Sequence, residues 1–547
     1  MIISKRQFSW VLRFSSAYKC RLLFYLLLEV LALSFSLAFI WFSKQSIDSA
    51  VSGLGRNITA LLVFTASSLV LSYTCTQVAN YVNEFNKARM LVDLQQKILA
   101  RQVLIRWDGE KKHTGDLMVR LISDTQEIVT AVGQTFISCV VGLIKIFAAT
   151  WFLWWMDPWL AIVLLSITPF LLFSKFYFRK LRILQKSLKQ AESELGKTIQ
   201  DNLRLRLLIR SMNQERWRWK NVETHQNDIF QIKKSLIGFS TFSKGIWGFV
   251  FCLSYIVAFV WGIHNLNAGL ITVGTMSAFL QLVIRIQSPA AALLGNIPSL
   301  IRLGSSVDRI EELLSEPVEQ IVEPCILNEI DELKLSNLTL NHDGVPLVQN
   351  IDFSFKIGSP SVILGFSGLG KSTILRTMLG LRNPEAGTIE LTTAGRKLNM
   401  SPAYRCNFAF VPQGEKIFSD TIRNNLTFGI QDCSDEQLYQ ALKIACATFV
   451  FELPSGLETM VGESGFGLSE GQLQRIAVAR AIMQPASIWL FDEVTSALDR
   501  ETAHKLVKNL IEFGRDRIIV FVTHDMTLKT YFENTLDLTE HCTSFNK

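Results

Sequence analysis

The sequence predicts a membrane domain made only of α-helices, with six spans, followed by a soluble α/β domain. Nearly all long apolar runs lie before about residue 300, although hydrophobic residues make up an ordinary 49% of the 547 residues. After Pro317 the pattern changes to short apolar stretches between turn residues, which is typical of an α/β domain. We expect the membrane domain at 1–315, a linker at 316–330 and the α/β domain at 331–547.

Six stretches are predicted to span the membrane, of which the first five are long enough, or nearly so, to cross a hydrocarbon core of roughly 30 Å as helices, and the sixth is weaker. The first five are Arg21–Trp41, Ala60–Val82, Val132–Met156, Trp159–Phe178 and Ile246–Ile263. The sixth begins near Leu270 and runs into Arg285 and Pro289. The alternative, a large soluble bundle, would have to cover several nearly charge-free helices on all sides.

The distribution of lysine and arginine predicts how these spans are oriented. Positive charges gather before the first span and after the second and the fourth, whereas the other connections carry few. The positive-inside rule therefore places the N-terminus and the α/β domain in the cytoplasm. The polar segments Asn83–Gly133 and Arg179–Ser243 keep a helical period, so we expect membrane helices to continue through them into the cytoplasm.

Charge and cysteine content exclude some classes of partner. The net charge of +7 is accounted for by the basic residues beside the spans, so it requires no nucleic-acid partner. The nine cysteines are scattered without a CxxC pair, which is typical of reduced packing residues.

The α/β domain contains a glycine loop between an apolar strand and a helix, in SVILGFSGLGKSTILRTMLG. This is the context of a P-loop, where glycines let the backbone wrap phosphate oxygens and the helix N-terminus adds partial positive charge. Lys371 would reach the β- and γ-phosphates, and Ser372 would hold Mg²⁺. We therefore predict a P-loop α/β nucleotide-binding domain. The loop residues expected to bind ATP are Gly365, Phe366, Ser367, Gly368, Leu369, Gly370, Lys371, Ser372 and Thr373.

A second motif, ASIWLFDEVTSALD, supplies two adjacent carboxylates after a buried strand. Asp492 is placed to bind Mg²⁺ directly or through water. Glu493 follows it and is suited to orient or polarise the water that attacks the γ-phosphate. These residues predict a magnesium-dependent ATPase.

Together the motifs resemble those of an ATP-binding cassette (ABC) transporter half-molecule, over essentially the whole chain. VPQGEKIFSDTIRNNL resembles the Q-loop of that family, which implies that Gln413 contacts Mg²⁺ and the attacking water. VTHD and SALD resemble its switch and D-loop motifs, which gives those roles to His524 and Asp499. TGDLMVRLISD and MNQE resemble the cytoplasmic coupling loops of its exporter-type fold.

The segment VGESGFGLSEGQLQRIAVARAI resembles the signature region of the family. In this family two nucleotide domains associate head to tail, so the signature of one lies over the ATP held by the other. The residues expected to act in trans are Leu468, Ser469, Glu470, Gly471 and Gln472. The resemblance therefore implies a second half-transporter, either another copy of this chain or a similar one.

Two positions depart from the family pattern. His342 occupies the place of the aromatic residue that stacks on adenine, and it is either a stacking group or a solvated turn residue. Glu470 stands where glycine is commoner, while Ser469, Gly471 and Gln472 remain in place.

The resemblance implies an ATP-driven transporter in a bacterial plasma (inner) membrane, exporting a lipid, peptide or amphipathic drug-like molecule by alternating access. Import on the same fold and an ATP-gated channel or regulator are the alternatives. Ionisable residues within the apolar spans are candidates for substrate contact, and they also fit interfacial or helix-pairing roles. They are Glu29, Lys145 and Arg285.

Overall fold

The computed structural model describes residues 4–52, 58–106, 114–167, 174–342, 345–366, 368–414, 417–430, 432–462 and 467–541. They form two compact units. A helical unit extends to Glu316, and an α/β unit begins at Pro317 and also includes residues 104–106.

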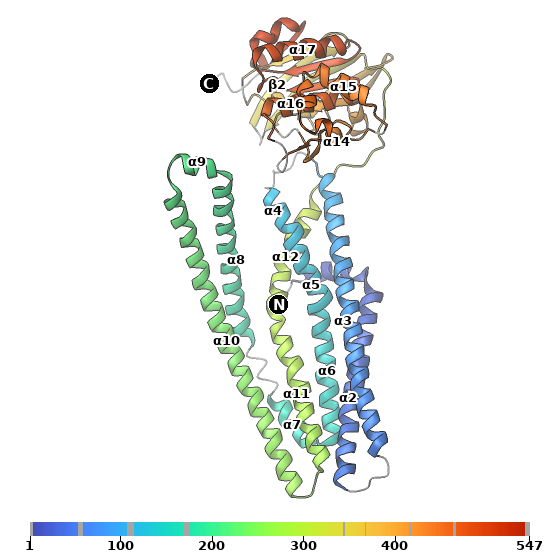
Figure 1. The fold of residues 1–547 in the computed structure, drawn as a ribbon, viewed down its shortest axis with the longest axis vertical. Helices are drawn as coiled ribbons and strands as arrows, with labels where there is room; N and C mark the ends of the chain where they lie inside the picture. The colour runs from blue at the N-terminus through green and yellow to red at the C-terminus, as the bar shows by residue number, and fades with distance from the viewer. Residues whose placement is uncertain are drawn as a thin grey trace. The chain divides into compact units, whose positions relative to one another are not determined.

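The helical unit is built from long helices (Figure 1). In chain order they are α1 (Lys5–Ser16), α2 (Lys19–Val51), α3 (Ile58–Val103), α4 (Thr114–Val119), α5 (Thr125–Thr130), α6 (Phe136–Met156), α7 (Pro158–Ile167), α8 (Ser174–Arg204), α9 (Arg206–Ser211), α10 (Glu215–Asn267), α11 (Val273–Gly295) and α12 (Ile297–Ser315). Two π-helical turns, Arg120–Asp124 and Ala131–Thr135, join α4, α5 and α6 into one helical column.

Five helical stretches among the described residues are long and apolar enough to cross a membrane. They are Lys19–Val51, Ile58–Val103, Asp116–Met156, Glu215–Asn267 and Val273–Ser315. The first four each contain a predicted span, and the fifth overlaps the span predicted to begin near Leu270. The remaining predicted span, Trp159–Phe178, includes residues 168–173, which lie outside the described part of the chain.

Helices α2, α6 and α11 pack together around large apolar side chains. Ile40, Leu153 and Phe279 are fully buried between them. At Gly274 a Cβ atom would lie 2.3 Å from the carbonyl oxygen of Lys44, so only glycine allows α11 to begin this close to α2. The backbone N–H of Gly274 also donates a 2.9 Å hydrogen bond to Asp48.

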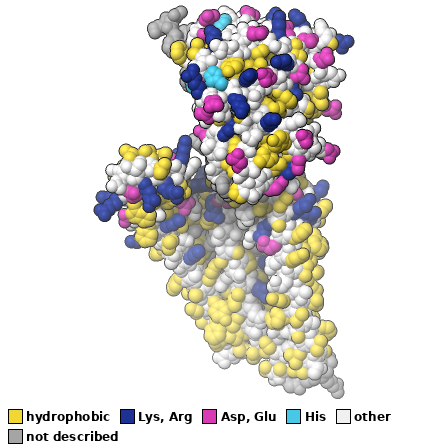
Figure 2. Space-filling view, turned by 45° about the horizontal axis from the view of Figure 1, so that its top comes forward, with side chains coloured by type: hydrophobic (Ala, Val, Ile, Leu, Met, Phe, Trp, Pro, Cys, Tyr) yellow, Lys and Arg dark blue, Asp and Glu magenta, His cyan; other side chains and the backbone are white. Residues whose placement is uncertain are grey.

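Helices α8 and α10 form an antiparallel hairpin closed by the short helix α9 (Figure 1). The polar segment after the fourth predicted span is therefore helical, as expected from its period. Basic side chains gather at the tip of this hairpin (Figure 2), where α9 contributes Arg206 and Arg210.

The α/β unit is organised by a parallel sheet of order β11-β3-β10-β9-β6. Its strands are β3 (Ser361–Leu364), β6 (Phe408–Val411), β9 (Ile488–Asp492), β10 (Ile518–Val522) and β11 (Asn534–Asp537). Val522 pairs with Asp492, so β9 and β10 end at the same edge of the sheet. Because loops at the carboxyl ends of parallel strands meet at this edge, it is where ligand-binding residues gather.

An antiparallel sheet of order β2-β1-β4-β5 packs beside the parallel one. Its strands are β1 (Glu332–His342), β2 (Val345–Lys356), β4 (Ala386–Thr393) and β5 (Arg396–Asn399). Two short strands, β7 (Asp420–Thr421) and β8 (Met460–Val461), pair elsewhere in the unit.

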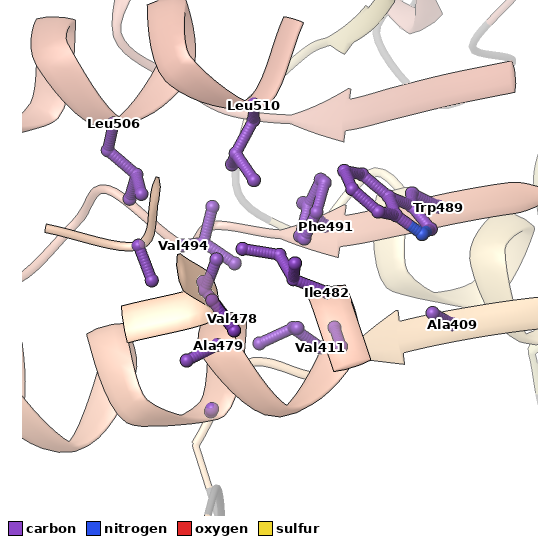
Figure 3. Close-up of a cluster of buried hydrophobic side chains, with 14 of the residues drawn as sticks. Ala409, Val411, Val478, Ala479, Ile482, Trp489, Phe491, Val494, Leu506 and Leu510 are labelled. Atoms are coloured by element: carbon purple, nitrogen blue, oxygen red, sulfur yellow. The ribbon is translucent and has the colours of Figure 1, made fainter. Parts of the chain in front are cut away.

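The helices of this unit pack on the parallel sheet. They are α13 (Lys371–Met378), α14 (Ile422–Leu426), α15 (Asp435–Ile444), α16 (Glu470–Met483) and α17 (Arg500–Phe513). Figure 3 shows Val478 and Ile482 of α16 among the buried side chains next to Val411 and Phe491. Helices α14, α15, α16 and α17 therefore share one apolar core with the parallel sheet, whereas α13 packs in a second core together with the antiparallel sheet.

Candidate nucleotide site

The glycine loop after β3 has the backbone conformation that a phosphate-binding loop needs. Gly365, Gly368 and Gly370 have φ angles of 151°, 87° and 91°, in a region that side chains rarely adopt. A Cβ atom at Gly370 would also lie 3.2 Å from a methyl group of Leu347. Helix α13 begins at Lys371, directly after this loop.

The ammonium group of Lys371 lies inside the loop. It donates hydrogen bonds of 2.7 Å to the carbonyl oxygen of Gly365 and 3.1 Å to that of Phe366. The residue is buried, while the Phe366 side chain is exposed. Leu369 is buried in the core below the loop, and Ser372 and Thr373 occupy the first turn of α13. Ser367 lies outside the described residues.

Asp492 and Ser372 fit a magnesium site. Burial raises the pKa of Asp492, and a hydrogen bond from the Ser372 side chain partly opposes that rise. Among the described residues, Oδ1 of Asp492 has no hydrogen-bond partner although it is buried. Two oxygen ligands of this kind suit Mg²⁺. The described residues contain no group of three His, Cys, Asp or Glu side chains that would hold a metal ion. Further ligands would be the Gln413 side chain, as the family resemblance implies, nucleotide oxygens or water.

Three predicted residues converge on the carboxylate of Glu493. Gln413, which follows β6, donates a 2.6 Å hydrogen bond to Oε2. Nδ1 of His524, which follows β10, lies 3.8 Å from Oε1, and Nζ of Lys371 lies 4.0 Å from the same oxygen. The folded chain thus brings the P-loop, the Q-loop and the switch motif to one carboxylate.

The Glu493 backbone has a conformation that is unusual for a residue with a side chain. Its φ angle is 51°, in the left-handed region. Its N–H donates a 2.9 Å hydrogen bond to Val522 at the end of β10. This turn directs the carboxylate toward the edge of the sheet rather than into the core.

A cleft of about 430 Å³ opens beside this carboxylate. His524 is mostly exposed, with 64% of its side-chain surface accessible. The residues that line the cleft are Glu493, Thr495, Ser496, Leu498, Thr523, His524, Asp525, Met526 and Thr527. The D-loop and the switch motif therefore form its two walls.

The signature residues form the start of α16. Ser469 caps this helix by accepting a 3.3 Å hydrogen bond from the N–H of Gln472, whose side chain accepts a 2.8 Å bond from the N–H of Ser469. Leu468 packs against the core, and Glu470 is exposed in the first turn. At Gly471 a Cβ atom would lie 2.5 Å from the carbonyl oxygen of Ala497. The signature glycine therefore permits close contact with the D-loop.

Asp499 caps a helix in this structure. It precedes α17 and accepts a 2.9 Å hydrogen bond from the N–H of Thr502. Hydrogen bonds from Thr502 hold its pKa below the ordinary value of 3.8. A structural role thus accompanies the predicted D-loop role.

The sequence leaves His342 either as a group that stacks on adenine or as a solvated turn residue, and it gives Gln474 no predicted role. His342 is the last residue of β1, and its side chain lies outside the described part of the structure. Gln474 is buried in α16 and donates a 2.7 Å hydrogen bond to the carbonyl oxygen of Glu493. The sequence signals Gln474 only as a polar residue on the helix face that is otherwise apolar in RIAVARAI and the turn before it.

Two of the three candidates for substrate contact pair with each other. Lys145 of α6 lies 2.8 Å from the carboxylate of Glu29 on α2, and the Glu29 side chain is 9% exposed. Arg285 of α11 is exposed on the surface of the chain. Among the described residues, it has no hydrogen-bond or ion-pair partner.

Comparisons with known proteins agree with this geometry. The model of the ABC transporter transmembrane region matches residues 22–289, and the ABC transporter model matches 348–496. The chain is 28% identical to the ATP-dependent permease MDL1 of Candida albicans, over 89% of this chain and 73% of that protein. It is 24% identical to the ATP-dependent lipid A-core flippase of Syntrophus aciditrophicus, over 91% and 83%.

A further relative is the putative multidrug export ATP-binding/permease protein YgaD of Bacillus subtilis, 24% identical over 95% of this chain and 92% of that protein. The fold is similar to a solved bacterial Atm1-family ABC exporter with ATP bound. The TM-score is 0.82 at 20% identity, covering 96% of this chain and 94% of that one. At this identity the match shows the fold of the two domains.

Proposed function

The chain belongs to the ABC transporter family, because models of both domains of that family together match most of it, and from this premise we propose that it exports amphipathic molecules across a bacterial inner membrane. It is an ATP-driven transmembrane transporter. The proposal of export is supported by two relatives, one named as a lipid A-core flippase and one as a putative multidrug export protein.

The convergence of Gln413, His524 and Lys371 on Glu493 carries the proposed ATPase chemistry. Glu493 orients and polarises the attacking water, and Gln413 and His524 position that carboxylate. When ATP is bound, Lys371 contacts the β- and γ-phosphates instead of the carbonyl oxygens of the loop with which it now forms hydrogen bonds. Ser372 and Asp492 would hold Mg²⁺, which supplies charge neutralisation on the phosphates when it is bound.

We infer that the active form contains two such chains or this chain with a similar half-transporter. Each chain carries one P-loop and one signature, and the signature residues sit at the start of a helix, where backbone N–H groups favour an anion. Ser469 and Gly471 would thus contact the γ-phosphate held by a partner, with Asp499 beside them in the D-loop. ATP closes the pair, and hydrolysis removes the phosphate that holds it closed.

The arrangement of charges in the spans supports an anionic substrate. Helices α6 and α11 run in opposite directions. They are close together where a Cβ atom on Gly142 of α6 would lie 3.7 Å from Pro289 of α11. Lys145 and Arg285 each lie about one turn from that contact, in the same direction along the bundle. Lys145 and Arg285 therefore lie at about the same level along the helix bundle. Glu29, which pairs with Lys145, lies at this level too.

This level therefore carries one negative and two positive side chains. Glu29 is the only Asp or Glu in the six predicted spans, so a second copy of the chain would bring no free acid to Arg285. An uncompensated charge within a bilayer is costly and usually marks a functional site. We propose that Arg285 binds the anionic group of an amphipathic substrate, while Glu29 and Lys145 stabilise each other.

ATP-dependent movement in proteoliposomes tests this function and its direction. The substrates would be a fluorescent phosphatidic acid and a phosphatidylcholine with the same chains, with Glu493→Gln as the inactive control. We expect movement away from the ATPase side, with a preference for the anionic lipid that Arg285→Gln reduces. Movement toward the ATPase side would indicate import, and ATP turnover without movement of either lipid would contradict the proposed substrate class.

A further inference from the structure

The backbone of Glu493 is held by hydrogen bonds from three separate elements. Its N–H donates to Val522 of β10, and its carbonyl oxygen accepts from both the N–H and the hydroxyl of Ser496, at 3.2 and 2.9 Å. The shortest bond to that oxygen, 2.7 Å, comes from Nε2 of Gln474 on α16. A left-handed residue with a side chain persists only where its surroundings determine it, so these bonds hold the backbone conformation from which the carboxylate projects.

Gln474 is an unexpected residue for its position. It is 1% exposed, and among the described residues its Oε1 has no hydrogen-bond partner. A buried amide that is satisfied on one side only costs stability. A carbonyl oxygen can only accept, so the NH₂ group of Gln474 must face Glu493. An apolar side chain of the same size would fill this space at least as well, which points to a role other than packing.

Gln474 also lies on the helix that begins with the signature. Ser469 caps α16, and Gln474 lies in the second turn, so the rigid helix connects the two. Gly471, between them, allows the first turn to contact the Ala497 carbonyl in the D-loop. Farther along, Val478 and Ile482 anchor the helix in the core (Figure 3). Helix α16 thus connects the signature to the turn that follows Glu493.

We propose that Gln474 is a positioning residue that holds the Glu493 carboxylate in its working orientation and links it to the signature loop of the same chain. This inference rests on the proposed ATPase function and the proposed pairing of two half-transporters. In such a pair Ser469 contacts the nucleotide of the partner, whereas Glu493 acts on the chain's own nucleotide. Occupancy of one site then adjusts the catalytic carboxylate of the other through α16.

The test compares Gln474→Met with Gln484→Met in full-length protein in lipid nanodiscs. Gln484 follows the same helix and donates a 3.0 Å hydrogen bond to the carbonyl oxygen of Phe428, away from Glu493, so it is a matched control. For Gln474→Met we expect kcat to fall at least about tenfold, as for a misplaced catalytic group. The KM for ATP and the unfolding temperature should change little, and Gln484→Met should keep wild-type kcat.

Hydrogen exchange provides a second measurement that needs no turnover. In Gln474→Met the amides of residues 493–496 should exchange roughly 2- to 10-fold faster, the effect of one lost hydrogen bond, while those of 476–482 stay protected. Wild-type kcat in Gln474→Met, or unchanged exchange at 493–496, would overturn the inference. A loss of kcat accompanied by a large drop in unfolding temperature would assign Gln474 a purely structural role. Failure of the proposed function would look different, because wild-type protein itself would then hydrolyse no more ATP than Glu493→Gln.

Discussion

The side-chain amide of Gln413 donates a 2.6 Å hydrogen bond to the carboxylate of Glu493 and so joins the loops that follow β6 and β9. These strands are neighbours in the parallel sheet, and the contact is a direct consequence of their pairing. Its donor comes from the Q-loop and its acceptor from the proposed catalytic residue. The orientation of Glu493 therefore depends on where the Q-loop lies.

Removing this donor should impair hydrolysis more than binding. A hydrogen bond to a charged group contributes about 1.5–3 kcal/mol, so Gln413→Met should lower kcat roughly 10- to 100-fold. The affinity for ATP should stay near that of the wild type, because the P-loop is unchanged. Steady-state hydrolysis and equilibrium binding of a fluorescent ATP analogue measure the two effects separately. Equal losses in kcat and binding would show that Gln413 acts on nucleotide affinity instead.

A methyl group at the signature glycine should disturb the D-loop. In Gly471→Ala the new Cβ would lie 2.5 Å from the backbone oxygen of Ala497, which cannot move without shifting the turn. Overpacking of this kind costs about 1–3 kcal/mol. We expect a lower unfolding temperature and loss of most ATP turnover. Gly467→Ala is the matched control, since no atom lies within 4 Å of a Cβ there, and equal behaviour of the two variants would contradict the contact.

The charge pair in the helical unit predicts a compensating double variant. Lys145→Met leaves the buried Glu29 carboxylate without its cation and should cost about 3 kcal/mol of stability. Adding Glu29→Gln removes the unpaired charge, so the double variant should recover most of that loss. Thermal unfolding in nanodiscs measures both. A double variant no more stable than Lys145→Met would show that the pair does not determine stability.

The linker should lose its attachment to the α/β unit in acid. Arg405 donates hydrogen bonds of 2.9 and 2.8 Å to the two oxygens of Glu319, and this holds the pKa of Glu319 below its ordinary value of 4.5. Since the folded pKa is depressed, the stabilisation is complete above pH 4.5 and disappears as pH falls through the folded pKa. We expect the free energy of unfolding of wild type to exceed that of Glu319→Gln by about 1 kcal/mol or less at neutral pH. The difference should vanish in acid, and a pH-independent difference would contradict the pair.

The motifs of the α/β domain could be predicted from sequence because each is local. The strand, glycine loop and helix around Lys371 are contiguous, and so is the strand that ends at Asp492. The roles of Gln413 and His524 were expected only from the resemblance to the family. In the structure both residues reach Glu493 because β6, β9 and β10, which precede them, are neighbours in the parallel sheet. The membrane spans before residue 300 could also be predicted, because a long apolar run is compatible with few structures other than a membrane helix.

Contacts that join distant segments were not predictable in this way. Nothing in the local pattern of α2 and α6 shows that Glu29 and Lys145 face each other. The approach of Gly471 to Ala497 and the bond from Gln474 to Glu493 depend on how α16 packs against the loop after β9. The left-handed backbone of Glu493 is unusual for its residue type, and tertiary hydrogen bonds impose it.

The role of Glu493 is tested most directly by ATP hydrolysis in lipid nanodiscs, comparing wild type with Glu493→Gln in the presence of Mg²⁺ and after its removal. Glutamine keeps the size of the side chain but cannot accept a proton, and general bases contribute about 10²- to 10⁴-fold. We predict that the variant binds ATP as tightly as wild type yet loses at least about 99% of the magnesium-dependent turnover. Wild-type turnover in Glu493→Gln would remove this carboxylate from the chemistry.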